Sequence, residues 1–188
     1  MSLAIGRVLT AEQRLYKATA DIIGHDDFVA LASVLMIGSK KIVDGLPTAC
    51  TNGRDELYGR EFVDSLNDKQ LAFLILHENM HKAYRHLVVW ESLYKKDAEL
   101  ANLACDYVIN LQIQDYDPSG EVTEFPTDDN GKPMGCIDEA YRGMDSLQVF
   151  NLLEKKHGTK KERTKYVEVG IEGDRSSGGD GEGIPQGF

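Results

Sequence analysis

The sequence predicts an α+β fold in which a small β-sheet packs on two long helices. Short apolar segments between residues 40 and 59 are separated by glycine, proline and Asn-Gly turn signals, which is typical of strands. Two longer segments, residues 67–90 and 97–114, carry apolar residues at helical spacing behind good helix caps. With 41% hydrophobic residues, the chain can bury a core. We expect one domain over residues 1–169 and a flexible, glycine-rich and acidic tail over 170–188.

The first part of the chain predicts a helix followed by the sheet. Thr10 and Gln13 form a capping-box pattern at the start of a helix over residues 10–23. The apolar segment 28–37 fits a helix or a buried strand, and we favour a short helix or turn that leads into a strand. Strands are then expected at residues 40–44, 48–51 and 56–59, the last two being joined by a turn at Asn52 and Gly53.

The rest of the chain predicts three helices. Asn67 and Gln70 repeat the capping box ahead of a buried central helix over residues 67–90. Residues 91–96 are expected to form an exposed connection to the helix over residues 97–114, and residues 115–135 a loop. A late amphipathic helix is expected over residues 145–156, with its inward side chains at Leu147, Phe150, Leu152 and Leu153.

Within the central helix lies the segment HENMH, residues 77–81. Positions four apart on a helix face the same way, so His77 and His81 can each offer a ring nitrogen to one ion. Glu78 then lies beside that ion, where its carboxylate can take a proton from an attacking water. Polar groups aimed into a core are costly unless they have a partner. The segment therefore predicts a Zn²⁺ site with His77 and His81 as ligands and Glu78 as the catalytic base.

The alternative interpretation is an ordinary helix that carries two surface histidines. It requires a solvated stripe at these positions. Leu71 and Leu74 continue the stripe that carries the histidines, which argues against exposure.

A catalytic zinc site usually has three protein ligands. On the helix over residues 97–114, Asn102, Asp106 and Asn110 form a column at positions i, i+4 and i+8. Asp106 supplies an anionic oxygen and is the expected third ligand, while Asn102 and Asn110 are expected to hold ligands in place by hydrogen bonds. The alternative is a solvated Asn/Asp face, which is common on helices.

His86 is the alternative third ligand. On a continuous helix it lies about 180° around the axis from His77, so it could bind the ion only if the helix broke after His81. No glycine lies between His81 and His86 to make such a break. A supporting role for His86 is therefore favoured over direct ligation. Asp97 and Glu99 are further candidates in a more polar segment.

Three segments together resemble a known family: TACTNG at residues 48–53, LHENMH at 76–81 followed by His86, and NLACDYVIN at 102–110. They resemble the putative metallopeptidase domain of bacteria and phages, which often precedes a von Willebrand factor A-like domain. The resemblance implies a zincin-like α+β fold, with Glu78 as base and His77 and His81 as ligands. The family's usual glycine before the later histidine is replaced here by Arg85.

Composition limits the partners. The formal net charge of -10 argues against nucleic acid or an anionic membrane as the main partner. The three cysteines lack CxxC spacing, and the first residues lack the pattern of a signal peptide, so we expect reduced thiols and a cytoplasmic location.

The leading hypothesis for function is a zinc-dependent metallopeptidase that acts on a peptide or protein. The strand formed by Thr48, Ala49, Cys50 and Thr51 would then be a sheet edge on which an extended substrate pairs. A second hypothesis is a non-catalytic regulatory or interaction module that the metal holds together. A third is a metal-free helical interaction domain.

Overall fold

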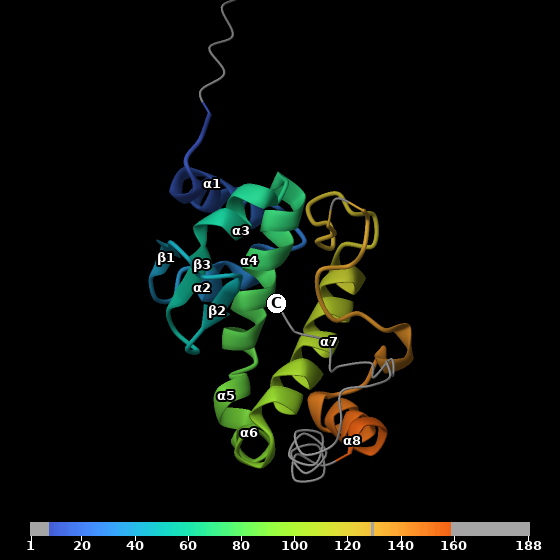
Figure 1. Cartoon of the computed structure of the whole chain (residues 1–188). Coiled ribbons are helices and arrows are strands. Elements are labelled where there is room, and N and C mark those ends of the chain that lie inside the picture. Colours follow the sequence, from blue (N-terminus) through green and yellow to red (C-terminus); the bar gives the residue numbers. More distant parts are fainter. Residues whose placement is uncertain (1–7, 129, 159–188) are drawn as a thin grey trace, which may run out of the picture.

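The computed structural model describes residues 8–128 and 130–158 (Figure 1). The predicted domain boundary at residue 169 and the predicted tail lie outside the described residues. Within them the fold is α+β, as predicted, with a small three-stranded sheet and a majority of helices. In chain order the elements are α1 (Ala11–Ile23), the 3₁₀ helix η1 (Val29–Leu31), α2 (Ala32–Leu35), β1 (Lys40–Val43), β2 (Ala49–Thr51), β3 (Glu56–Gly59), α3 (Arg60–Ser65), α4 (Asp68–Ala83), α5 (His86–Val89), α6 (Glu91–Lys96), α7 (Ala98–Tyr116), the 3₁₀ helix η2 (Glu139–Tyr141) and α8 (Ser146–His157).

The sheet has the spatial order β1-β3-β2. β1 runs parallel to β3, whereas β2 runs antiparallel to β3 and places Cys50 opposite Leu57. The predicted turn at Asn52 and Gly53 joins β2 to β3, and Gly53 has the positive φ of 87° that favours glycine. β2 therefore lies at an edge of the described sheet, which is the position that the sequence predicts for it.

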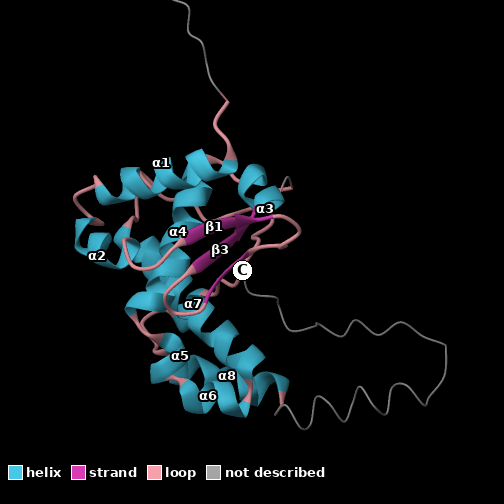
Figure 2. Ribbon diagram, turned by 90° about the vertical axis from the view of Figure 1, so that its left-hand side faces the viewer, coloured by secondary structure: helices cyan, strands magenta, loops and turns pink. Residues whose placement is uncertain are grey.

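Helix α4 runs through the middle of the fold, between the sheet and α7 (Figures 1 and 2). The predicted capping box starts it, because the backbone N–H of Gln70 donates to Asn67 Oδ1 at 2.9 Å and that of Asn67 donates to Gln70 Oε1 at 3.1 Å. All residues from Gln70 to Lys82 are buried. One core cluster joins α4 to α1 and the sheet, and a second lies among α6, α7 and α8. Any polar side chain in this buried stretch of α4 must therefore find its partners inside the protein.

The prediction that the central helix continues to residue 90 is wrong. α4 ends at Ala83, and Arg85 adopts the left-handed conformation, with φ 51° and ψ 42°, before α5 begins at His86. The break occurs without a glycine, although this conformation costs a non-glycine residue about 1–2 kcal/mol. It changes the direction of the chain and buries His86, which is 3% exposed.

Replacing Arg85 with glycine is expected to stabilise the fold by about 1 kcal/mol, because glycine adopts positive φ without strain. Arg85 is exposed, so the change removes no buried side chain. Chemical denaturation measures the difference. The matched control is Lys95→Gly in α6, where glycine replaces an exposed residue of regular helix and is expected to destabilise by about 1 kcal/mol. Equal destabilisation by both changes would contradict the assigned conformation of Arg85.

Other helices differ from the sequence prediction. Residues 91–96 form helix α6 rather than an exposed connection, and α3 was not predicted. α8 begins as predicted behind Asp145, but Leu147 and Leu152 are 41% and 42% exposed rather than inward. Val149, Phe150 and Leu153 form its buried stripe, which is narrower than the sequence pattern indicated.

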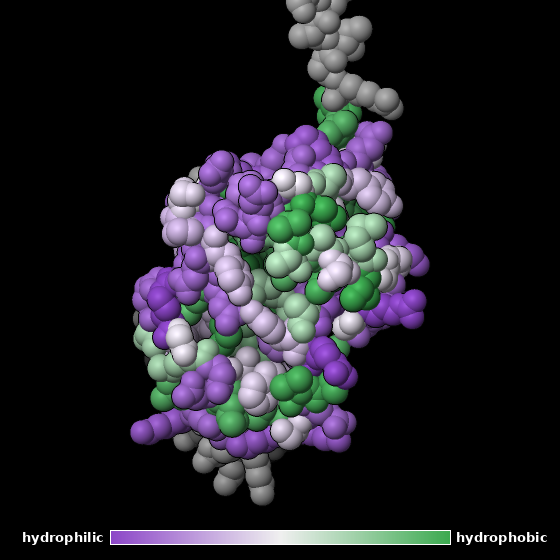
Figure 3. Space-filling view, turned by 180° about the vertical axis from the view of Figure 1, so that it is seen from behind, coloured by the Kyte–Doolittle hydropathy of each residue, from purple (hydrophilic) through white to green (hydrophobic). Residues whose placement is uncertain are grey.

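The surface carries apolar side chains in patches between hydrophilic ones (Figure 3). Exposed large hydrophobic residues include Met36 after α2 and the run Leu87, Val88 and Val89 of α5. Among the described residues, no helix has the length and apolar character that crossing a membrane requires. The three cysteines are free. The cytoplasmic location and the exclusion of nucleic acid stay predictions.

Candidate metal centre

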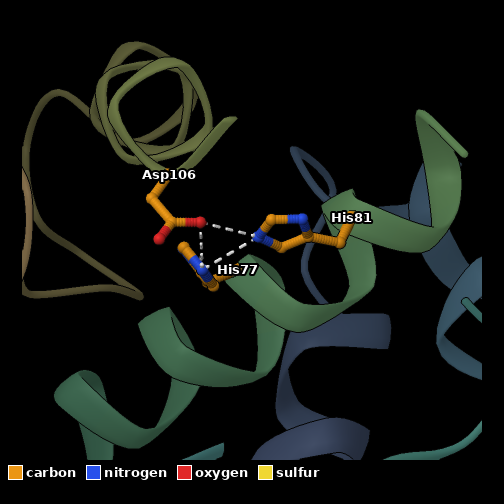
Figure 4. A group of neighbouring side chains, drawn as sticks. All are labelled: His77, His81 and Asp106. Atoms are coloured by element: carbon orange, nitrogen blue, oxygen red, sulfur yellow. Dashed lines mark hydrogen bonds and ion pairs between the residues drawn. The ribbon is translucent and has the colours of Figure 1, made fainter. Parts of the chain in front are cut away.

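Three side chains from two helices point toward one another between α4 and α7 (Figure 4). His77 and His81 lie one turn apart on α4, so both face α7, and Asp106 of α7 reaches toward them. All three are buried, with exposures of 2%, 8% and 1%. The structure thus brings the two histidines of the HExxH segment to the aspartate of the predicted column.

The facing atoms are spaced like ligands of one metal ion. His77 Nε2 and His81 Nε2 lie 3.1 Å apart, and Asp106 Oδ1 lies 3.6 Å from the first and 3.1 Å from the second. Ligands held at zinc bond lengths around a tetrahedral ion lie roughly 3.3–3.4 Å from one another. Asp106 Oδ1 is also buried and accepts no hydrogen bond from the described residues. A cation would relieve that cost, so the donor set fits a metal ion.

Burial sets the protonation states of the three groups. It lowers the pKa of His77 to about 4, with His81 adding to the effect, and it lowers the pKa of His81 to about 4. Burial raises the pKa of Asp106 to about 6, although His77 partly offsets the rise. At pH 7 the imidazoles are therefore neutral and the carboxylate is ionised. These are the states that bind a metal ion.

Asn110 fixes the orientation of His77. The Asn110 amide Nδ2 donates to the carbonyl oxygen of Cys136 at 2.8 Å, which turns its Oδ1 toward His77 Nδ1 at 2.7 Å. His77 Nδ1 then carries the hydrogen and donates it, so the lone pair of Nε2 points at the other two groups. This arrangement fits the supporting role that the sequence predicts for Asn110.

Asn102 and His86 contact the other two candidate ligands. Asn102 Nδ2 donates to Asp106 Oδ2 at 2.9 Å, which leaves Oδ1 facing the histidines. His86 Nδ1 lies 3.2 Å from His81 Nδ1, behind the ring nitrogen that faces Asp106. The prediction that His86 lies on the opposite side of the helix is wrong, because the break at Arg85 returns it to His81.

Replacing Asn110 with alanine is expected to weaken zinc binding about 10–100-fold, because His77 loses the partner that fixes its ring and its tautomer. Competition with a chromophoric chelator measures the affinity. The control is Asn151→Ala, which makes the same change at an exposed position of α8. Equal zinc affinity of the Asn110 variant and the wild type would show that the hydrogen bond does not orient the ring.

Glu78 lies beside these groups, in a cavity of about 90 Å³. Burial raises the pKa of Glu78 well above its usual range, and the nearby carboxylates of Asp106 and Glu56 raise it further. Of the predicted substrate strand, Ala49, Cys50 and Thr51 line the cavity, whereas Thr48 precedes β2. The other lining residues are Gly53, His77, Glu78, His81, Leu87, Tyr94, Asn102 and Asp106.

Sequence reasoning missed two parts of this site. Leu87 and Tyr94 line the cavity from α5 and α6, which the break at Arg85 positions. A buried charge network also lies under the site, where Glu56 of β3 accepts hydrogen bonds from Lys82 and Asn79 of α4. Lys82 could have indicated this network, because it lies at the end of the buried stretch of α4, where a lysine requires an internal partner.

Comparison with protein families matches residues 10–184 to the putative metallopeptidase domain. No curated protein and no solved structure matches the chain. The family description and the buried group of His77, His81 and Asp106 both point to a metal ion. Since the match spans nearly the whole sequence, this chain belongs to the putative metallopeptidase domain family, as the sequence predicts.

Proposed function

We propose that the domain is a zinc-dependent peptidase. The observation that carries this proposal is the buried triangle of His77 Nε2, His81 Nε2 and Asp106 Oδ1, with its unpartnered oxygen, beside a buried glutamate in a cavity. Two imidazoles and one carboxylate are a donor set of catalytic zinc sites. When bound, Zn²⁺ supplies a Lewis acid that activates water and polarises the scissile carbonyl.

Glu78 is proposed as the general base. It follows His77 in the chain, so its carboxylate lies next to the candidate ligands, and it lines the cavity. Its side chain is buried beside the candidate ligands, where an ionised carboxylate can accept a proton from water. Glu78 would take a proton from the attacking water and deliver it to the leaving amine.

Strand β2 is proposed to hold an extended substrate. At the start of the β2–β3 pair, the backbone N–H of Gly59 donates to Thr48 O at 2.7 Å. Bonded and non-bonded pairs alternate along an antiparallel ladder, so the N–H and C=O of Ala49 and Thr51 point to the free side. Both residues line the cavity, which supports pairing of a peptide backbone beside Glu78.

A second candidate function is a regulatory module in which the metal has a structural role. The triangle lies between α4 and α7. α4 carries much of the first core cluster and α7 much of the second, so a metal ion at the triangle would join the two clusters, which favours this alternative. This alternative requires a closed coordination shell, as in structural zinc sites. The peptidase requires an open position on the ion that faces the cavity.

Metal analysis combined with an activity assay tests both functions. We expect about one zinc per chain, and cleavage of unfolded casein that a chelator abolishes and that added Zn²⁺, but not Mg²⁺, restores. Zinc without cleavage of casein or of a random peptide library would overturn the peptidase and favour the structural role. Absence of bound zinc would overturn both. With Co²⁺ in place of zinc, a hydroxamate should change the visible spectrum if a coordination position is open.

A further inference from the structure

Tyr94 of α6 lines the same cavity as Glu78 and the candidate metal ligands. Its ring packs against the second core cluster, which holds the side chain in place. Its hydroxyl donates to Asn102 Oδ1 at 3.5 Å and is also hydrogen-bonded to the Cys105 thiol. A hydrogen bond of 3.5 Å is weak, and sulfur is a weak acceptor. The hydroxyl is therefore available to a better acceptor that enters the cavity.

Tyr94 and Glu78 border the candidate metal centre from different elements. The Tyr94 hydroxyl lies against Asn102 of α7 and is close enough to Asp106 to be affected by its charge. Glu78 lies close enough to Cys50 of β2 to raise the pKa of that thiol, after the larger effect of burial. A carbonyl group held in the cavity would thus be bordered by both the Glu78 carboxylate and the Tyr94 phenol.

We propose that Tyr94 is a further catalytic residue, whose hydroxyl donates a hydrogen bond to the substrate carbonyl oxygen as that oxygen gains negative charge. This inference rests on the proposed peptidase function. Donors placed where charge develops stabilise the transition state, because they strengthen as the oxygen becomes anionic. The phenol stays protonated for this role, since burial and the neighbouring Cys105 and Asp106 raise the pKa of Tyr94 above its usual value.

Tyr94 and Glu78 have separate tasks in the proposed hydrolysis. As the oxygen of water bonds to the carbonyl carbon, the π electron pair of the C=O bond moves to the carbonyl oxygen, and the proton of the water goes to Glu78. The electron pair on that oxygen then re-forms the C=O bond as the C–N bond breaks with its electron pair on nitrogen, and Glu78 gives its proton to that nitrogen. Tyr94 transfers no proton and no electron, and it only stabilises the anionic oxygen.

The test compares Tyr94→Phe with the wild type on a casein peptide that the wild type cleaves. The variant keeps the ring that packs in the core, so folding and zinc content should not change. We expect kcat to fall about 10²-fold with little change in KM. A phosphinic analogue of the same peptide, which imitates the tetrahedral state, should bind the variant more weakly by a similar factor. Calorimetry measures this binding without turnover.

The matched control is Tyr107→Phe, which removes a hydroxyl from the same core cluster at a position outside the cavity lining. It should leave kcat and the affinity for the phosphinic peptide unchanged. If the wild type cleaves the peptide and Tyr94→Phe matches it within twofold in both kcat and phosphinic affinity, the role of Tyr94 is overturned while the peptidase stands. If the zinc-loaded wild type cleaves nothing, the proposed function fails and the inference fails with it.

Discussion

Glu78→Gln is expected to lower the rate of peptide cleavage about 10²–10⁴-fold while zinc stays bound. Glutamine has nearly the same shape as glutamate but cannot take a proton from the attacking water. Glu78 is not one of the three groups whose ligand atoms face one another, so its loss should not release the ion.

Three measurements decide this prediction. Zinc content and thermal stability should match the wild type, and only kcat should fall. The control variant is Glu99→Gln, which makes the same change at an exposed position of α7 and should leave kcat unchanged. Unchanged cleavage by a Glu78→Gln protein that retains its zinc would disprove the mechanism.

Local hydrogen bonding was the part of the fold that the sequence predicts best. Each of the capping boxes, at Thr10 and at Asn67, is formed within a segment of four residues, and both are present in the structure. The meeting of His77 and His81 with Asp106 could also be anticipated, because each helix carries its polar residues at helical spacing and a buried carboxylate needs a partner. That these residues bind zinc stays a prediction.

The parts that could not be predicted depend on tertiary packing. Arg85 has no local reason to be left-handed, and the break becomes intelligible only when His86 is seen packed behind His81. Tyr94 enters the cavity because α5 and α6 follow that break. No periodicity in residues 84–96 encodes this change of direction.

The charge network under the site is a second case of tertiary packing, and it should be the most sensitive point of the fold. Glu56 is fully buried, and its Oε1 lies 2.5 Å from Lys82 Nζ and 3.1 Å from Lys40 Nζ. Its Oε2 accepts hydrogen bonds from Tyr58 and Asn79. Strand β3, helix α4 and strand β1 therefore meet at a single carboxylate. This network could not be predicted from local sequence, because Glu56 precedes Lys82 by 26 positions.

Glu56→Gln is expected to destabilise the protein by about 3–5 kcal/mol, because it removes the carboxylate that pairs directly with two buried ammonium groups. The double variant Glu56→Gln/Lys82→Met should lose less than the sum of the two single variants, since it removes one of those charges together with the carboxylate. Urea unfolding of the four proteins gives the coupling energy.

The control is Glu91→Gln, which breaks an exposed ion pair with Lys95. The side chains of Glu91 and Lys95 are 64% and 71% exposed. That change should cost less than about 1 kcal/mol. Strictly additive losses in the cycle, or a Glu56 effect as small as that of Glu91, would mean that the carboxylate does not hold β1, β3 and α4 together.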